Sequence, residues 1–453
     1  MPEGIRPVVL AAGKGTRMRS DLPKALHRLA GRPMLGHVLD ALEAAGLQKP
    51  LCVVGYGGEL IEEYLGERAD VVWQKEQLGT GDAVRTALGA LPDAGWVLVV
   101  NGDLPLLQGD TLKDLVAQSG PLGGLLAAEV ALPAGFGRIE RTQAGGLGRI
   151  VEDADCDERQ RAIREINVGA YLLPLRPLRE AIARLGKENA QGEIYFVDAV
   201  TDLATQGRVA VVDAPAEEAA QVNDRRELAL AEAALRRRQV ERLMQNGVTV
   251  LDPATTYVDA TVEVGRDSVL HPFTFLEGET RIGEGCEIGP QVRLLDSMLG
   301  DACKVSFSVV EETQLGDGTA CGPFTHLRPG TRTGKQVSIG NFVEMKGVEF
   351  GDQTNVRHHS YLGDAAIGRR VNIGAGTVIV NYDGRRKHFT RIGDGAFIGC
   401  NANLISPVDI GREGYVAAGS TINQNVPDEA LAIARERQRN IEGWVARRRS
   451  REE

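Results

Sequence analysis

The sequence is short of paired cysteines, of long apolar runs and of excess positive charge. Its six Cys stand at positions 52, 156, 286, 303, 321 and 400, and no two of them form a CxxC pair. Free thiols in a reducing compartment therefore fit better than disulfides or a zinc site. The N-terminus offers only Val8–Ala12 as an apolar run, which is too short for a signal-peptide core. No stretch approaches the ~20 apolar residues of a membrane span, so we expect a cytoplasmic protein with no membrane partner.

The charge balance excludes a second class of partner. Lys and Arg total 52 and Asp and Glu total 62, which gives a net charge of −10. A mildly acidic chain argues against broad binding to nucleic acid or anionic lipid, although a local basic pocket for phosphate remains compatible with it. The hydrophobic fraction of 43% is high enough for sizeable cores, so the chain is not disordered.

Glycine, by contrast, is abundant, with 55 residues, and the second half of the chain shows a reason. An aliphatic residue recurs there at every sixth position, many times with glycine directly after it. A six-residue period is typical of a parallel β-helix, in which each hexad makes one short strand and one corner. The polar stretch Asn381–Thr390 interrupts the period and should protrude as a loop. The first run is Val258, Val264, Leu270, Leu276, Ile282, Ile288 and Leu294; later runs end at Leu362, at Ile379 after a slip of one residue, and at Ile422.

The first half has a different pattern, in which short apolar runs alternate with helical periodicity. We predict strands at 8–12, 51–54, 71–73 and 96–100, and helices at 34–45, 82–91 and 111–117. This alternation is typical of an α/β domain with a mainly parallel, Rossmann-like sheet, which binds ligands at the carboxyl ends of its strands. Residues 224–245 are highly charged and precede Asn246-Gly247, which predicts one helix with a glycine stop. The expected division is 1–222, a linker helix at 223–247, and a β-helix with a C-terminal tail at 248–453.

Two features of the first half suggest a phosphate site. The first strand leads into Leu10-Ala-Ala-Gly-Lys-Gly-Thr-Arg-Met18, whose small residues allow a ligand close to the backbone N–H groups. The loop is neither a Walker motif nor GxGxxG, so by itself a tight turn remains an alternative. Arg17 and Lys24 add positive charge. Asp103 directly follows the fourth strand, where an Asp serves a divalent metal or a turn equally well.

These motifs, taken with Gln77-Leu-Gly-Thr80, Gly135-Phe-Gly137, Ile150-Val-Glu152 and Val222-Asn-Asp-Arg225, resemble the sugar-1-phosphate nucleotidyltransferases. The hexad region contains three further motifs, Leu327-Arg-Pro-Gly330, Asn341-Phe-Val-Glu-Met-Lys346 and Asn381-Tyr-Asp-Gly384. Together they resemble the bacterial bifunctional family that acetylates glucosamine-1-phosphate and then uridylates N-acetylglucosamine-1-phosphate. The alternative is a sugar-1-phosphate nucleotidyltransferase whose β-helix is not catalytic.

For uridyl transfer from UTP, the resemblance implies Mg²⁺ held by Asp103 and Asn223. Catalysis should rest on positioning and charge, because the sugar phosphate is already a nucleophile. Arg17 and Lys24 would neutralise phosphate charge. Asn101 stands where the family usually has Tyr, which puts its contact in doubt. The implied uridine-nucleotide and sugar residues are Leu10, Ala11, Ala12, Gly13, Lys24, Gln74, Gly79, Thr80, Asn101, Gly102, Asp103, Gly137, Glu152, Asn167 and Asn223.

For acetyl transfer from acetyl-CoA, a base that titrates near neutrality should be His. The family pattern selects His358 rather than His359, and strand alternation should point the two to opposite faces. Cys400 replaces the usual Ser, and a thiol is the weaker donor. The resemblance implies a left-handed β-helix and a homotrimer. It assigns Arg328, Lys346, Tyr361 and Asn372 to glucosamine-1-phosphate, and Ala375, Asn381, Tyr382, Cys400, Ala418 and Arg435 to acetyl-CoA.

Overall fold

The computed structural model describes residues 4–186 and 189–452. The chain divides into two compact units, residues 1–236 and 237–453, which are described separately below. No helix in the described ranges is long and apolar enough to cross a membrane. All six cysteines are free thiols, and Cys400 alone among them is exposed.

The first unit is built on a mixed sheet. Its strand order is β11 (Ala210–Asp213), β7 (Gly124–Glu129), β10 (Glu165–Pro174), β6 (Trp96–Asn101), β1 (Ile5–Ala11), β4 (Leu51–Val54) and β5 (Asp70–Trp73). The strands from β6 to β5 are parallel, as predicted, but β10 runs antiparallel to both β6 and β7. β8 (Arg138–Arg141) and β9 (Leu147–Val151) form a hairpin that joins β10.

Both faces of this sheet are covered by helices because successive strand residues point to opposite sides. Val9, Leu98 and Val100 pack in one apolar cluster, and Val8, Val97 and Val99 pack in the other. The first cluster takes in α1 (Met34–Ala44) and α4 (Gly109–Gln118); the second takes in α3 (Thr80–Gly89), α6 (Leu175–Ala183) and α7 (Phe196–Gln206). The three predicted helices are present, although α3 begins two residues earlier than expected. The remaining helices before residue 210 are α2 (Gly58–Leu65) and α5 (Glu158–Arg161).

The predicted charged helix is α8 (Arg225–Gln245). Its first half contributes Ala231 and Ala234 to an apolar cluster of the first unit. Its second half contributes Val240 and Leu243 to the core of the second unit. The division between the units therefore falls inside this helix, at residue 236.

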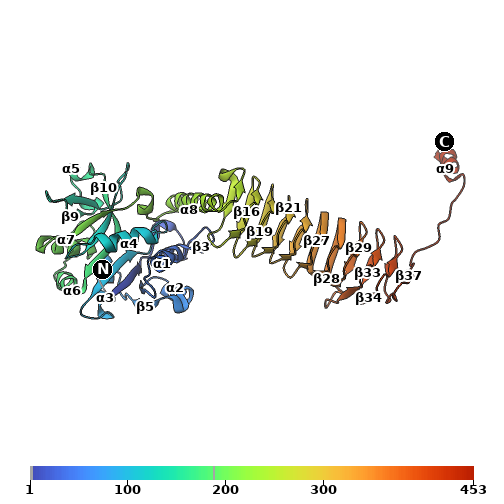
Figure 1. Ribbon diagram of the computed structural model, residues 1–453, viewed down its shortest axis with the longest axis horizontal. Helices are drawn as coiled ribbons and strands as arrows, with labels where there is room; N and C mark the ends of the chain where they lie inside the picture. The colour runs from blue at the N-terminus through green and yellow to red at the C-terminus, as the bar shows by residue number, and fades with distance from the viewer. Residues whose placement is uncertain (1–3, 187–188, 453) are drawn as a thin grey trace. The chain divides into compact units, whose positions relative to one another are not determined.

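The second unit is a parallel β-helix that runs from β12 (Thr249–Val250) to β37 (Leu431–Ala432), with its coils stacked side by side (Figure 1). The hexad positions fill its core, but Val264 is only half-buried, against expectation, near the first coil. The slip in the hexad period follows from coil length. Thr274 pairs with Val292, 18 residues on, whereas Val356 pairs with Ile373, only 17 residues on. The C-terminal tail ends in α9 (Trp444–Glu452).

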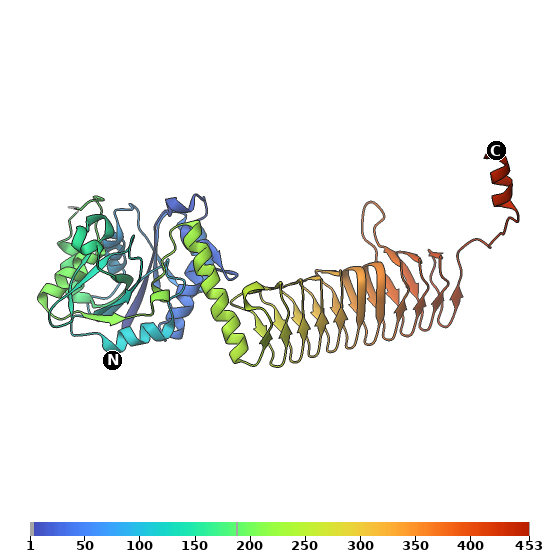
Figure 2. The same cartoon turned by 90° about the horizontal axis from the view of Figure 1, so that it is seen from above.

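Five strands of one face carry the residues discussed below: β16 (Thr274–Glu277), β19 (Val292–Leu295), β22 (Val309–Glu311), β25 (His326–Arg328) and β27 (Ser338–Phe350). They are followed by β28 (Asn355–Ile367), β29 (Asn372–Ile373), β30 (Val378–Val380) and β31 (Thr390–Ile392). The chain between β30 and β31 projects from one edge of the β-helix, in the orange part of Figure 2. This is the predicted loop, although its flanking residues Asn381 and Thr390 are buried.

Candidate active sites

A cavity of about 400 Å³ lies at the carboxyl ends of β1, β5 and β6 in the first unit. The glycine-rich loop after β1 forms one wall, and the segment that leads into α3 forms another. Gly79 begins that segment with φ 111°, and a Cβ there would lie 2.6 Å from the carbonyl oxygen of Ile194, so only glycine fits. The predicted residues that line the cavity are Leu10, Ala11, Ala12, Gly13, Lys24, Gln74, Gly79, Thr80, Asn101, Gly102 and Asp103.

An ion pair on the cavity wall joins residues far apart in the sequence. Lys24 Nζ lies 2.7 Å from Asp103 Oδ2 and 3.1 Å from Asn223 Oδ1. The other carboxylate oxygen of Asp103 is buried and has no hydrogen-bond partner. A buried, unpartnered carboxylate oxygen beside an amide oxygen is the kind of hard-ligand pair that fits Mg²⁺. The structure thus brings together three of the four side chains that the sequence had assigned to charge neutralisation and metal binding; the fourth, Arg17, is not part of this group.

Gly137, Glu152 and Asn167 form a separate group: Gly137 directly precedes β8, Glu152 directly follows β9, and Asn167 lies on β10. A Cβ on Gly137 would lie 3.5 Å from Asn167 Cβ and 3.7 Å from Glu152 Oε1. Asn167 Nδ2 donates a hydrogen bond to the Tyr171 hydroxyl at 2.6 Å. Burial, reinforced by the nearby Asp198, raises the pKa of Glu152 to about 6. The group presents a carboxyl, an amide and an open backbone position, which suits a polyhydroxylated ligand.

Asn101 lies at the end of β6 and lines the cavity. A Cβ on Gly169 of β10 would collide with Asn101 Nδ2, so the amide packs directly against that glycine.

Arg17 lies in a short 3₁₀ helix, Thr16–Met18, just after the glycine-rich loop, and it is not among the cavity-lining residues. Sequence reasoning assigned no role to Gln77 and Glu193, which do line the cavity. The Gln191-Gly-Glu193 motif was the signal that could have placed Glu193 there.

The second candidate site follows one corner of the β-helix. β28, β29, β32 (Phe397–Ile398) and β35 (Tyr415–Val416) stack in register through Asn355, Asn372, Phe397 and Tyr415. Three residues further along each coil, His358, Ala375, Cys400 and Ala418 therefore occupy one column, which we call the corner column. Arg435 continues it, because a Cβ on Gly419 would lie 3.8 Å from Arg435 Cδ. Both His358 and Cys400 are exposed.

His359 lies beside this column, and the expectation for it was wrong. Strand alternation should have turned it away from His358, but both imidazoles are exposed. The reason is the backbone of His359, whose φ of 35° turns the corner and ends the alternation. Phe324 and Phe342 occupy the same position in the two preceding coils, with φ near 59° and 58°. His359 is thus a corner residue whose carbonyl accepts a hydrogen bond from Gly376 N at 2.8 Å.

The opposite edge of the same face carries a cluster of cations. Arg328 stands in register with Lys346, and Lys346 with Gly363. The Lys387 ammonium, from the projecting hairpin, lowers the pKa of Lys346, with a smaller effect from Arg328. A Cβ on Gly363 would lie 2.6 Å from Asn381 Nδ2 and 2.8 Å from the Tyr361 hydroxyl, so these two groups converge above the glycine. Lys387 is a residue that sequence reasoning missed; only its place in the polar insertion pointed to it.

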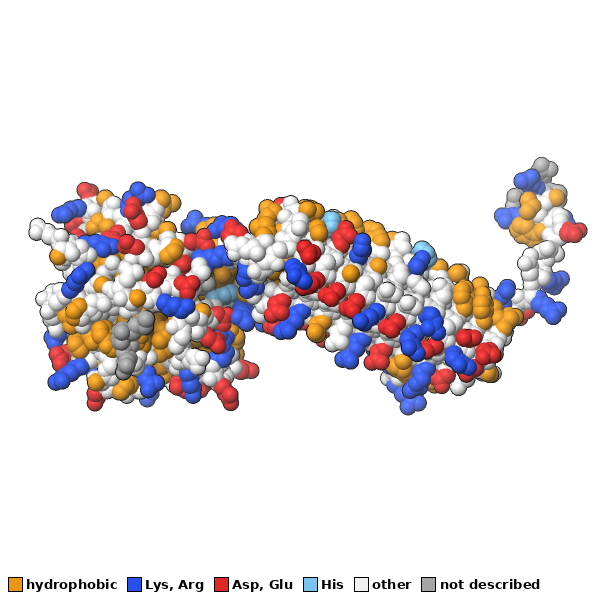
Figure 3. Space-filling view, in the orientation of Figure 1, with side chains coloured by type: hydrophobic (Ala, Val, Ile, Leu, Met, Phe, Trp, Pro, Cys, Tyr) orange, Lys and Arg blue, Asp and Glu red, His pale blue; other side chains and the backbone are white. Residues whose placement is uncertain are grey.

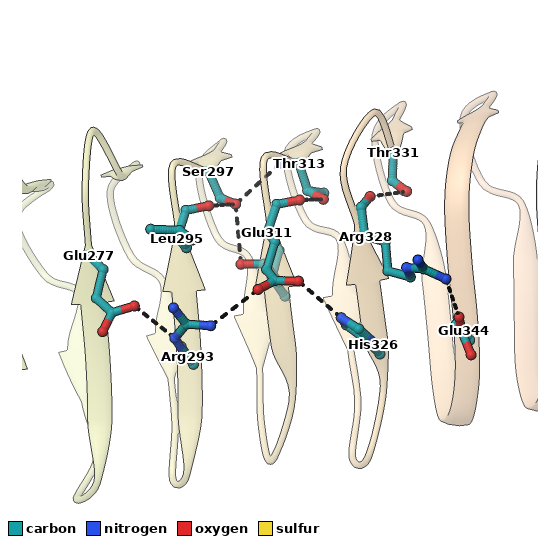
Figure 4. A network of polar contacts seen from close by, with 11 residues as sticks. Glu277, Arg293, Leu295, Ser297, Glu311, Thr313, His326, Arg328, Thr331 and Glu344 are labelled. Carbon is teal, nitrogen blue, oxygen red and sulfur yellow. Dashed lines mark hydrogen bonds and ion pairs between the residues drawn. The ribbon is translucent and has the colours of Figure 1, made fainter.

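A series of polar contacts runs along this face, with Arg328 and its partner Glu344 next to it (Figure 4). Acidic and basic side chains are interspersed over the β-helix surface (Figure 3). Here Arg293 contacts Glu277 at 2.7 Å and Glu311 at 3.1 Å, and His326 Nε2 lies 3.1 Å from Glu311 Oε2. Arg328 Nη1 donates to Glu344 Oε1 at 2.9 Å, which fixes the guanidinium at the edge of the cation cluster.

Two predicted residues lie apart from these groups. Asn372 stands on the neighbouring face, in register with Asn355. Tyr382 lies on the projecting hairpin, where its side chain is 57% exposed. Tyr382 is linked to the cation cluster only through its backbone bridge to Lys387 among the described contacts.

Known proteins resemble this chain along its whole length. Residues 7–195 match the MobA-like NTP transferase domain, and residues 389–424 match six repeats of the bacterial transferase hexapeptide family. The bifunctional protein GlmU of Caldanaerobacter subterraneus subsp. tengcongensis is 46% identical over 450 residues, which is 98% of each chain. That of Heliobacterium modesticaldum is 46% identical over 447 residues, or 97% of this chain and 98% of its own. The chain belongs to the bifunctional GlmU family. Family membership accounts for both fold units, since each relative spans both of them.

Among solved structures, a UDP-glucose pyrophosphorylase complexed with UDP-glucose matches with a TM-score of 0.43 and 19% identity. The match covers 52% of this chain and 100% of that chain. So distant a likeness adds nothing about the two sites.

Proposed function

We propose that this bifunctional enzyme of UDP-N-acetylglucosamine synthesis performs its two reactions at the two sites described above. It acetylates glucosamine-1-phosphate and then transfers uridyl from UTP to N-acetylglucosamine-1-phosphate. One observation supports the assignment of sites: each folded unit carries, within itself, most of the groups proposed for one of the two reactions. The alternative of a non-catalytic β-helix is not supported, because the bifunctional relatives match both units.

In acetyl transfer, the amine of glucosamine-1-phosphate attacks the thioester of acetyl-CoA. His358 accepts the proton that the nitrogen loses as the N–C bond forms, and the C–S bond breaks to release the CoA thiol. Arg328, Lys346 and Lys387 would hold the phosphate group, since three cations at one edge of a face suit a dianion. Tyr361 and Asn372 would contact the sugar, and Asn381 and Tyr382 would frame the reacting atoms.

The corner column is the proposed path of acetyl-CoA. Ala375 and Ala418 are small and leave room for an extended chain, and Arg435 supplies a charge for its phosphates. Cys400 lies between the two alanines in this column, with its thiol exposed. A thiol donates a weaker hydrogen bond than the hydroxyl of a Ser would.

In uridyl transfer, the sugar phosphate attacks the α-phosphate of UTP and pyrophosphate leaves. The protein must hold both anions in line and compensate their charge. The backbone from Leu10 to Gly13, with Gln74, Gly79 and Thr80, would bind the uridine. Gly137, Glu152 and Asn167 would bind the sugar, and Lys24 and Arg17 would face the phosphates.

Asp103 and Asn223 would hold Mg²⁺, which supplies Lewis-acid stabilisation of phosphate charge when bound. In the ligand-free arrangement, Lys24 forms hydrogen bonds with both of these residues. Its ammonium therefore compensates the charge of the half-buried Asp103 carboxylate, and it would turn toward the phosphates when the substrates bind.

We also propose that the enzyme is cytoplasmic and forms a homotrimer, and that its domains divide at residues 222 and 247. The exposed corner of the β-helix supports assembly, since Phe324 and Phe342 stack there with ring centroids 5.4 Å apart and side chains more than half exposed. Light scattering of the purified protein tests this. A species near 48.7 kDa, the mass of one chain, in an acetyl-transferring sample would refute the trimer.

The reaction sequence is tested by incubating the protein with glucosamine-1-phosphate, acetyl-CoA, UTP and Mg²⁺. UDP-N-acetylglucosamine should accumulate. The His358→Ala variant should form it only when N-acetylglucosamine-1-phosphate is supplied, whereas the Lys24→Ala variant should stop at that intermediate. Equal loss of both reactions in either variant would contradict the assignment of separate sites.

A further inference from the structure

The hairpin between β30 and β31 stands where neighbouring coils have one corner residue. Gly347 and Asp364 each turn this corner alone, between strand positions that remain paired on both sides. In the next coil, nine residues from Asn381 to Phe389 take the place of that single residue. Such a segment has no apolar core of its own, and ordering it costs conformational entropy. Specific polar contacts must therefore hold it in one conformation.

The base of the hairpin is held by backbone and amide contacts. Asn381 Nδ2 donates to Asp364 Oδ2 at 2.6 Å, and His388 N donates to the Asn381 carbonyl at 2.8 Å. Tyr382 and Lys387 form an antiparallel bridge one step further out. These contacts fix the residues nearest the β-helix.

The tip is held by one carboxylate. Asp383 Oδ1 accepts hydrogen bonds from the backbone N–H groups of Arg385 and Arg386, both at 2.8 Å. Its other oxygen, Oδ2, lies 2.7 Å from Nε2 of His388. The His388 side chain is only 19% exposed, so this contact is shielded from water more than the rest of the tip. The hydrogen bond from His388, with the two N–H groups, holds the pKa of Asp383 well below its usual range.

We infer that the Asp383–His388 contact is a latch that fixes the hairpin over the acetyl-transfer site, and that His388 is a positioning residue for glucosamine-1-phosphate. The inference rests on the proposed function of that site. Lys387 immediately precedes His388, and its backbone pairs with that of Tyr382. The latch therefore holds the stretch of backbone that carries the Lys387 side chain. Lys387 Nζ then lies 3.8 Å from Asp364 Oδ2 and close enough to Lys346 to lower its pKa. His388 acts through Lys387, because its own imidazole is engaged by Asp383.

The test compares His388→Ala and Asp383→Asn with His388→Gln, whose amide can still donate to the carboxylate. His271→Ala is the matched control, since His271 makes a similar contact with Glu287, at 3.4 Å, on a distant coil. The measurements are KM for glucosamine-1-phosphate and kcat of acetyl transfer. The initial rate of tryptic cleavage is measured as well, because Arg385, Arg386 and Lys387 place three cleavage sites in the hairpin.

We expect KM to rise about three- to tenfold in His388→Ala and Asp383→Asn, which corresponds to the loss of one partly exposed charged hydrogen bond. The value of kcat should stay within about twofold of that of the unaltered enzyme. Cleavage in the hairpin should accelerate in the same two variants, and His388→Gln should restore both values in part. The double variant should be no worse than either single one. Unchanged cleavage would overturn the latch, and faster cleavage with unchanged KM would overturn its positioning role. Absence of acetyl transfer in the unaltered enzyme would reject the proposed function instead, while the cleavage rates would still report on the latch.

Discussion

In the first unit the functional groups come from the ends of neighbouring strands, whereas in the β-helix they come from equivalent positions of successive coils. Folding of this unit brings Lys24 into contact with Asp103, which is 79 positions away in the sequence, and with Asn223, which is 199 positions away. The β-helix converts a regular sequence spacing into a line of side chains, as in the corner column from His358 to Ala418. One proposed site is therefore a cavity, and the other is a line of side chains along one corner of the β-helix.

The strongest test of this contrast is the substitution His358→Ala. Removal of a general base typically costs about 10²–10⁴-fold in rate, so kcat/KM of acetyl transfer should fall by at least about 10²-fold. Uridyl transfer should be unchanged, because its groups lie in the other unit. His359→Ala is the control and should lose far less. If His359→Ala were the inactive variant instead, the assignment of the corner column would be off by one residue.

Substitution of Lys24 tests the cavity in the same way and adds a second readout. Lys24→Met should lower kcat of uridyl transfer by about 10²-fold, as is typical when one donor to developing charge is lost. Because Lys24 contacts both proposed metal ligands, its removal should also leave Asp103 more available and tighten Mg²⁺ binding, measured by calorimetry without nucleotide. Weaker Mg²⁺ binding in this variant would argue against Asp103 and Asn223 as the ligands.

Truncation tests how independent the two units are. We expect residues 1–229 to fold and to catalyse uridyl transfer, but residues 1–236 should be more stable by about 2–4 kcal/mol. The longer fragment retains the buried Ala231 and Ala234, and it retains Glu232, whose carboxylate accepts a hydrogen bond from Ala30 N at 2.7 Å. Urea unfolding of both fragments measures the difference. Equal stability would show that this part of α8 does not belong to the first unit.

The smallest expected effect concerns pH. Glu152 has a pKa of about 6, raised by burial, so its carboxylate accepts hydrogen bonds from sugar hydroxyls above that pH and loses this ability as the pH falls through it. KM for N-acetylglucosamine-1-phosphate should therefore rise below pH 6, by up to about tenfold per pH unit. Glu152→Gln should show a flat KM over the same range. A wild-type KM independent of pH from 5 to 8 would remove Glu152 from the sugar site.

Local patterns predicted part of the first fold and the core of the second, because hydrophobic periodicity is set by which residues must be buried. In the first unit, β7 to β11 and the helices α6 and α7 were not predicted. The hexad period gave the parallel β-helix, and alternation of strands and helices gave the α/β sheet. The antiparallel β10 escaped prediction, since a fully buried strand has no pattern that distinguishes its direction. Val264 was assigned to the core by its spacing and is only half-buried, because the first coils lack a neighbour on one side.

The site residues were predictable only where a motif or a resemblance named them. Nothing local indicates that Lys24 contacts Asn223, since that contact depends on how the whole sheet folds. Lys387 was missed because a lysine in a polar loop is ordinarily a solvated charge. His359 was misplaced because its left-handed backbone at a coil corner is not visible in a rule of strand alternation.

The stacking of the coils also fixes the length of the corner column. Neighbouring strands lie about 4.8 Å apart, so the three coil steps from His358 to Ala418 span roughly 14 Å. On the path proposed for acetyl-CoA, the ligand would meet one side chain per coil, and its reactive end would lie beside His358. The number of coils between His358 and Arg435 would then set the length of the thioester that fits. One coil inserted between Cys400 and Ala418 would keep every proposed catalytic group and lengthen the column by about 4.8 Å, which would favour a longer acyl carrier.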